Sequence, residues 1–142
     1  MLFVYPADRS PDLSKKILIA DDEPNIVAAL EFLLQRNGYE VHVARNGEEA
    51  LKLVEDCNPD LVLLDVMMPV KSGYEVCTRI RERAGGGHIK IIMLSAKGRD
   101  AEVTKGLSIG ADHYITKPFS TRELMDKIKG LVDPGTEAGP PA

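Results

Sequence analysis

The chain contains few cysteines and no long apolar run. A transmembrane helix needs about 20 consecutive apolar residues. The apolar start at residues 1–5 also lacks the basic region and cleavage site of a secretory signal peptide. The two cysteines, Cys57 and Cys77, form no C-x-x-C pair, so we expect free thiols in a reducing compartment. These absences favour a cytoplasmic protein with no membrane segment.

An excess of positive charge is also missing. The sequence has 22 acidic and 18 basic residues, for a net charge of -4. Surfaces that bind nucleic acids are normally basic, so we expect no direct nucleic-acid binding by this domain. With 142 residues, 44% of them apolar and 28% charged, the composition fits one globular domain with a single core.

Five short apolar runs alternate with stretches of helical periodicity. The runs are residues 17–20, 41–44, 61–64, 91–94 and 114–116. The first, third and fourth runs are almost continuously apolar, as expected of parallel strands that are covered on both faces. The pattern therefore predicts an α/β fold of (βα)5 type, with a doubly wound parallel five-stranded sheet.

Helix signals lie between these runs. Pro24 suits a first helical turn and Gly38 a helix end. Asn46 begins an N-x-x-E start signal, and Ser120 with Glu123 forms a capping box. Two further helices are predicted from apolar spacing: Tyr74, Cys77 and Ile80 mark the third, and Val103 and Leu107 a weaker fourth.

The remaining segments carry no strong pattern. Residues 1–14 are expected to be an N-terminal extension, 15–132 the folded domain, and 133–142 a Pro/Gly-rich tail or linker. The glycines at 85–87 predict a flexible loop. The charged run at 79–83 predicts a solvated helix face.

Side chains that could take part in catalysis or ligand binding follow four of the five runs. Asp21 and Asp22 follow the first, Asp65 the third, Ser95 the fourth and Lys117 the fifth. Ligands of such sheets bind at the carboxyl ends of the strands. Carboxylates that converge there repel one another, and a hard cation such as Mg²⁺ removes the repulsion. A cation, a lysine and a hydroxyl suit phosphoryl transfer, in which an aspartate can be the nucleophile.

Each of these residues alone has a simpler interpretation. Asp21 and Asp22 could be an acidic pair that a helix dipole stabilises, and Asp65 a turn residue. Ser95 could cap a strand end, and Lys117 could be a solvated surface residue. Their placement at one edge of the predicted sheet favours a shared site.

Five motifs give this arrangement a family resemblance. Residues 17–24 read ILIADDEP, 65–69 DVMMP, 94–96 LSA, 110–114 GADHY and 117–119 KPF. Each motif alone is weak, but five in order at this spacing are specific. Over residues 15–132 the chain resembles the receiver domains of response regulators in two-component signal transduction. The resemblance implies a flavodoxin-like fold with strand order 2-1-3-4-5.

The resemblance also implies a role for each metal-site residue. Asp65 would be the phospho-acceptor. Asp22 would bind Mg²⁺ directly and Asp21 mainly through water, while Met67 would offer its backbone carbonyl to the metal. The domain would catalyse its own phosphorylation and dephosphorylation rather than act as a conventional enzyme.

The same resemblance implies a switch. Lys117 would pair with the phosphoryl group, and Ser95 would be the hydroxyl that moves toward it. The Lys117–Pro118 bond is expected to be cis. Tyr114 matches an aromatic residue whose rotamer follows the hydroxyl, although a half-buried strand tyrosine is equally a core element.

The implied partners are a histidine kinase or phosphotransfer protein as donor and an output partner. The output partner would bind the face formed by the fourth helix, fifth strand and fifth helix. A phosphorylation-linked homodimer through that face is open, because Val103 and Ile109 stand where charges would help it.

Two other functions remain as alternatives. A pseudo-receiver would bind partners without phosphorylation, but such domains usually lack one or more of these side chains. A phosphatase of the haloacid dehalogenase type needs a D-x-D motif near the first strand, which Asp21-Asp22-Glu23 does not supply.

Overall fold

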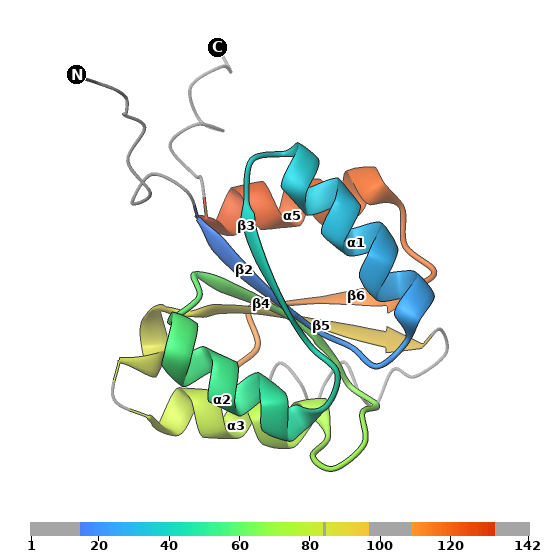
Figure 1. The fold of residues 1–142 in the computed structure, drawn as a ribbon. Helices are drawn as coiled ribbons and strands as arrows, with labels where there is room; N and C mark the ends of the chain where they lie inside the picture. The colour runs from blue at the N-terminus through green and yellow to red at the C-terminus, as the bar shows by residue number, and fades with distance from the viewer. Residues whose placement is uncertain (1–14, 84, 97–108, 133–142) are drawn as a thin grey trace, which may run out of the picture.

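The computed structural model describes residues 15–83, 85–96 and 109–132 (Figure 1). Five strands form one parallel sheet in the order β3-β2-β4-β5-β6. The strands are β2 (Lys16–Ala20), β3 (Glu40–Ala44), β4 (Leu61–Asp65), β5 (Lys90–Ala96) and β6 (His113–Lys117). Counted along the chain, the order is second, first, third, fourth and fifth. The predicted fold class and strand order are confirmed.

Helices cover both faces of the sheet. They are α1 (Pro24–Arg36), α2 (Gly47–Cys57), α3 (Gly73–Glu82) and α5 (Thr121–Val132). Helices α1 and α5 lie on one face, and α2 and α3 on the other (Figure 1). Within the described ranges, no helix is both long and apolar enough to cross a membrane. The predicted fourth helix at Val103 and Leu107, and the two tails, lie outside the described residues.

The alternation of side chains along each central strand divides the core in two. In β2, Ile17 and Ile19 face the α1/α5 layer, whereas Leu18 and Ala20 face the α2/α3 layer. All of these side chains are at most 1% exposed. Central strands that bury both faces appear in sequence as continuous apolar runs. Both cysteines are free, as predicted, and burial raises the pKa of the Cys77 thiol to about 11.

The predicted helix starts are confirmed by their caps. The Asn46 side chain accepts a hydrogen bond from the Glu49 N–H at 2.9 Å, and the Ser120 hydroxyl accepts one from the Glu123 N–H at 3.0 Å. Pro24 occupies the first turn of α1. Gly38, with a φ of +89°, follows the C-cap of that helix in a conformation that favours glycine.

Two local predictions are corrected by the structure. The glycines at 85–87 were predicted as a loop, and part of that segment is a short 3-10 helix, η2 (Gly86–His88), in which a side chain at Gly86 would collide with the Ile80 carbonyl. The charged run 79–83 is not uniformly solvated. Arg81 is largely buried and pairs with Asp112 at 2.8 Å, a partner that local periodicity cannot predict.

Candidate functional site

Strand pairing brings the aspartates together at one edge of the sheet. Strands β2 and β4 are neighbours, with Ala20 opposite Leu64, so Asp21 and Asp65 occupy the next positions at the same end. Carboxylate oxygens of Asp21, Asp22 and Asp65 all lie within 4.8 Å of one another. Asp21 is fully buried and Asp65 is 6% exposed, whereas Asp22 faces solvent. The structure therefore brings together the three carboxylates that the sequence predicts to meet.

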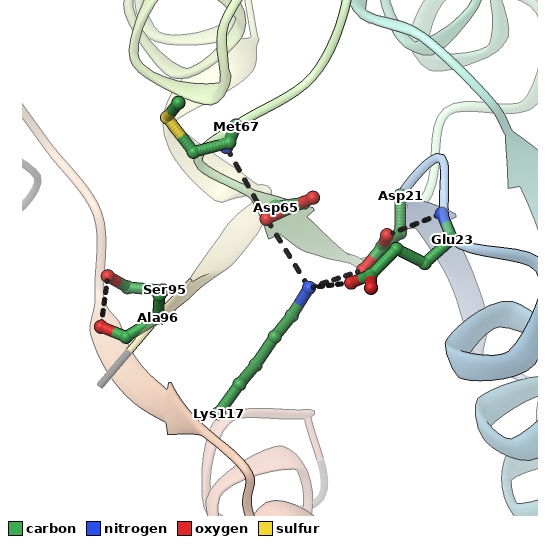
Figure 2. A network of polar contacts seen from close by, with 7 residues as sticks. All are labelled: Asp21, Glu23, Asp65, Met67, Ser95, Ala96 and Lys117. Atoms are coloured by element: carbon green, nitrogen blue, oxygen red, sulfur yellow. Dashed lines mark hydrogen bonds and ion pairs between the residues drawn. The ribbon is translucent and has the colours of Figure 1, made fainter.

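Lys117, the last residue of β6, reaches into this cluster. Its Nζ lies 2.9 Å from Oε1 of Glu23, 3.1 Å from Oδ2 of Asp21 and 3.5 Å from Oδ1 of Asp65. Figure 2 shows the lysine extended between the two aspartate-bearing segments. The ammonium group offsets part of the negative charge of the cluster. The Lys117–Pro118 bond is cis, as expected.

Burial and charge shift the ionisation of both central groups. Burial and the nearby charge of Asp21 raise the pKa of Asp65 from 3.8 to about 6, although Lys117 acts in the opposite direction. Burial lowers the pKa of Lys117, but its hydrogen bond to Glu23 and the charge of Asp65 outweigh that effect, so the net shift is upward. Asp65 is therefore mostly ionised at neutral pH, beside a protonated lysine.

The loop after Asp65 is fixed by backbone contacts. The Gly73 N–H donates to the Val66 carbonyl, and a side chain at Gly73 would collide with the Asp65 backbone. The Met67 N–H donates to Oδ1 of Asp65 at 3.4 Å, while the Met67 side chain is 60% exposed at the rim. These contacts hold the carboxylate of Asp65 in place.

The predicted switch residues lie beside the cluster. Ser95 is 2% exposed at the end of β5, and its hydroxyl donates to the Ala96 carbonyl at 3.3 Å. In Figure 2 this contact runs away from Asp65 and Lys117. Tyr114 packs against the α2/α3 core layer, and its buried hydroxyl has no hydrogen-bond partner among the residues that the structure describes.

An open pocket of about 480 Å³ lies over the cluster. Its polar residues are Asp22, Glu23, Asp65 and Lys117, and its apolar wall consists of Ile26, Met67, Ala96 and Pro118. Clustered carboxylate oxygens are the donor set that hard cations such as Mg²⁺ prefer. Burial, and after it repulsion by Asp21, raises the pKa of Asp65, and a cation would remove the repulsion. The residues present fit such a metal.

Comparison with known proteins decides the family. The model for the response regulator receiver domain matches residues 17–129 of the chain. The chain belongs to this family. It is a response regulator receiver domain of the kind found in two-component systems.

Individual relatives agree with this assignment. The receiver domain is 44% identical over 128 residues to the alkaline phosphatase synthesis transcriptional regulatory protein PhoP of Bacillus subtilis. The match covers 90% of the chain and 52% of PhoP, so the chain spans about half the length of that curated relative.

Solved structures show the same fold. The receiver domain of Francisella response regulator 1452 is 34% identical, with a TM-score of 0.76, and the match covers 83% of this chain and 96% of that one. The receiver domain of sensor histidine kinase PA1611 from Pseudomonas aeruginosa is 29% identical, with a TM-score of 0.77 and coverage of 83% and 97%. That structure has a magnesium ion coordinated in its active site cleft.

Sequence reasoning assigned no role to Glu23. Three carboxylates contact the Lys117 ammonium group in the structure, and that of Glu23 is nearer than those of Asp21 and Asp65, although Glu23 lies 94 residues away in the chain. Its adjacency to Asp21 and Asp22 was the available signal. The direction of its side chain depends on tertiary contact, which the motif does not encode.

Proposed function

We propose that this receiver domain accepts a phosphoryl group on Asp65 in a Mg²⁺-dependent reaction. The donor is the phosphohistidine of a histidine kinase or phosphotransfer protein. The supporting observation is the convergence of three carboxylates from the ends of β2 and β4 with the Lys117 ammonium group. A structural protein gains nothing from buried carboxylates that repel one another, whereas phosphoryl transfer uses such a cluster.

In this proposal an oxygen of Asp65 attacks the phosphorus atom. The new O–P bond forms as the P–N bond to the donor histidine breaks, and the imidazole leaves with the electron pair. The pKa of about 6 leaves most Asp65 ionised at neutral pH, so the nucleophile is available. The Nζ of Lys117 lies 3.5 Å from that carboxylate and would pair with the equatorial phosphoryl oxygens.

Asp22 and Asp65 would hold the metal through their carboxylates, Asp21 would act mainly through water, and the Met67 backbone carbonyl would be a further ligand. Mg²⁺ would neutralise charge on the carboxylates and the phosphoryl oxygens. The exposed position of Asp22 leaves it accessible to a hydrated ion, and the buried Asp21 suits an indirect role.

Phosphorylation would then act as a switch. It adds a charge close to -2 at the carboxyl edge of the sheet, toward which Ser95 and Lys117 would move. Tyr114 would change its packing in response, so that the face formed by β6, α5 and the fourth helix presents a different surface. This is a shift between two pre-existing packings. Output partners, and a homodimer, would use that face.

The proposal places the folded unit at residues 15–132 and its site of action in the cytoplasm. Receiver domains interact with histidine kinases and output domains, and PhoP, by its name, is a transcriptional regulator. We propose that any nucleic-acid contact belongs to an output domain and not to this receiver domain.

Intact-mass measurement tests the proposal. The protein is incubated with phosphoramidate in the presence of Mg²⁺ or of EDTA. We expect a phosphoryl adduct with Mg²⁺ that is absent with EDTA and absent in Asp65→Asn, while Asp60→Asn, at the opposite edge of the sheet, keeps it. An adduct that persists in Asp65→Asn would place the acceptor elsewhere, and no adduct in any condition would favour a pseudo-receiver.

A further inference from the structure

The contact between Glu23 and Lys117 has no explanation in helix capping or in the metal cluster. Glu23 is the N-cap residue of α1, but its side chain makes no capping hydrogen bond within the described part of the chain. It is also outside the group of Asp21, Asp22 and Asp65 whose oxygens converge. Its carboxylate instead extends toward Lys117, as Figure 2 shows, and makes the shortest of the lysine's three carboxylate contacts.

Lys117 is fully engaged in this arrangement. An ammonium group has three N–H donors, and here it faces the carboxylates of Asp21, Glu23 and Asp65. A phosphoryl group on Asp65 would add oxygens that need the same donors. The donor that faces Asp65, at 3.5 Å the longest of the three contacts, can turn to a phosphoryl oxygen. If the ammonium group moves closer to the phosphoryl group, its contact with Asp21 or with Glu23 must lengthen.

The burial of Asp21 and of Glu23 determines which of the two loses its contact with Lys117 at the lower free-energy cost. Asp21 has a fully buried side chain, and a buried carboxylate that loses its partner carries a large desolvation cost. The Glu23 side chain is 58% exposed, so water can solvate it as soon as the lysine leaves. Glu23 is the acceptor that Lys117 can release at the lower cost.

We propose that Glu23 is a positioning residue that holds Lys117 in the unphosphorylated domain and competes with the phosphoryl group for its ammonium. This inference rests on the proposed function of Asp65. Because the pair is partly exposed, its strength is that of a surface ion pair, and removing it would strengthen binding of a phosphoryl group by about two- to five-fold.

Beryllofluoride, which mimics a phosphoryl group on aspartate, provides the test. Its affinity is measured at saturating Mg²⁺ for the wild-type protein, Glu23→Gln and Glu48→Gln. Glu48 is the matched control, because it is an exposed residue in the first turn of α2 at the same edge of the sheet. We expect Glu23→Gln to bind beryllofluoride about two- to five-fold more tightly, with Glu48→Gln unchanged. The Lys117 side-chain ammonium NMR signal should shift in Glu23→Gln alone.

The possible failures are distinguishable. Wild-type protein that forms no beryllofluoride adduct would contradict the proposed function, and this inference with it. Wild-type protein that binds the probe while Glu23→Gln binds it equally or less tightly would overturn the inference alone. Equal gains in beryllofluoride affinity in Glu23→Gln and Glu48→Gln would show that the effect comes from net charge, and would also overturn the inference. A merely structural role for Glu23 would change thermal stability without improving probe affinity.

Discussion

At the scale of single residues, the buried carboxylate of Asp65 lowers the stability of the metal-free fold at neutral pH. Its pKa is about 6 in the metal-free fold, against an ordinary value of 3.8. The folded state therefore binds this proton more tightly than the unfolded chain. The free energy of unfolding falls as the pH rises from about 4 to about 6, and the loss is complete above that range.

Replacing Asp65 with asparagine should stabilise the metal-free protein. At pH 8 in EDTA we expect the free energy of unfolding to rise by about 1–3 kcal/mol, since one pKa unit corresponds to about 1.4 kcal/mol. The gain should shrink toward pH 4, where Asp65 is protonated. Urea denaturation measures both values. Asp126→Asn, an exposed control on α5, should show neither effect, and a destabilised Asp65→Asn would contradict the electrostatic account.

Val70, in the loop that follows Asp65, has a strained backbone conformation. Its φ is 72°, in the region that β-branched residues rarely adopt, and the Lys71 N–H donates to the Pro69 carbonyl at 2.8 Å around it. A hydrogen bond between residues i and i+2 around a central residue with positive φ defines the γ-turn, which is strained and rarer than the inverse γ-turn. The side chain is 69% exposed, so little packing offsets the strain.

Val70→Gly should therefore raise the free energy of unfolding by about 1 kcal/mol, because strain relief exceeds the entropy that glycine adds to the unfolded chain. Thermal or urea denaturation measures the change. Ala28→Gly, at an exposed position inside α1, should lower stability by about 1 kcal/mol. Equal losses in both variants would show that Val70 is not strained.

At the scale of elements, Arg81 joins segments that are distant in sequence. From α3 it donates hydrogen bonds to the carbonyls of Gly110, Gly86 and Ile89 and to the carboxylate of Asp112. Asp112 also accepts the Ile91 N–H at 2.8 Å. The network ties α3, η2, β5 and the entry to β6 together on the α2/α3 side of the sheet.

Arg81→Met should lower the free energy of unfolding by about 2–4 kcal/mol, since charge-assisted hydrogen bonds contribute about 1.5–3 kcal/mol each and several buried carbonyls lose a donor. Arg79→Met is the matched control on the same helix, where the side chain is 52% exposed and pairs with Glu75. Its effect should stay within about 0.5 kcal/mol. Similar losses in the two variants would contradict the special role of Arg81.

The same network shows where sequence reasoning reaches its limit at the level of elements. Strand β5 was predicted over residues 91–94 and extends from Lys90 to Ala96, because polar Ser95 still pairs in register with Thr116. Apolar patterning identifies the buried centre of a strand but not its polar ends. Arg81 is half of an ion pair across 31 residues, and no local period indicates it.

At the scale of the whole molecule, the fold and the convergence of the main site residues were predictable, whereas several individual side-chain contacts were not. The apolar runs of β2, β4 and β5 indicate burial on both faces, and this burial identifies them as the central strands. Because all the strands are parallel, Asp21, Asp22, Asp65 and Lys117, which lie at or just after strand ends, share one edge of the sheet. The contact of Glu23 with Lys117 and the contact of Ser95 with Ala96 depend on which side chains compete for the same partners in the folded protein.

The central claim is that carboxylates from β2 and β4 together bind one divalent cation. The most direct test is a Mg²⁺ titration followed by backbone amide NMR. We predict saturable shifts concentrated at residues 21–23, 65–67 and 117, greatly weakened in Asp65→Asn and unchanged in Asp126→Asn. Shifts that do not saturate, or that centre on another part of the sheet, would contradict the account.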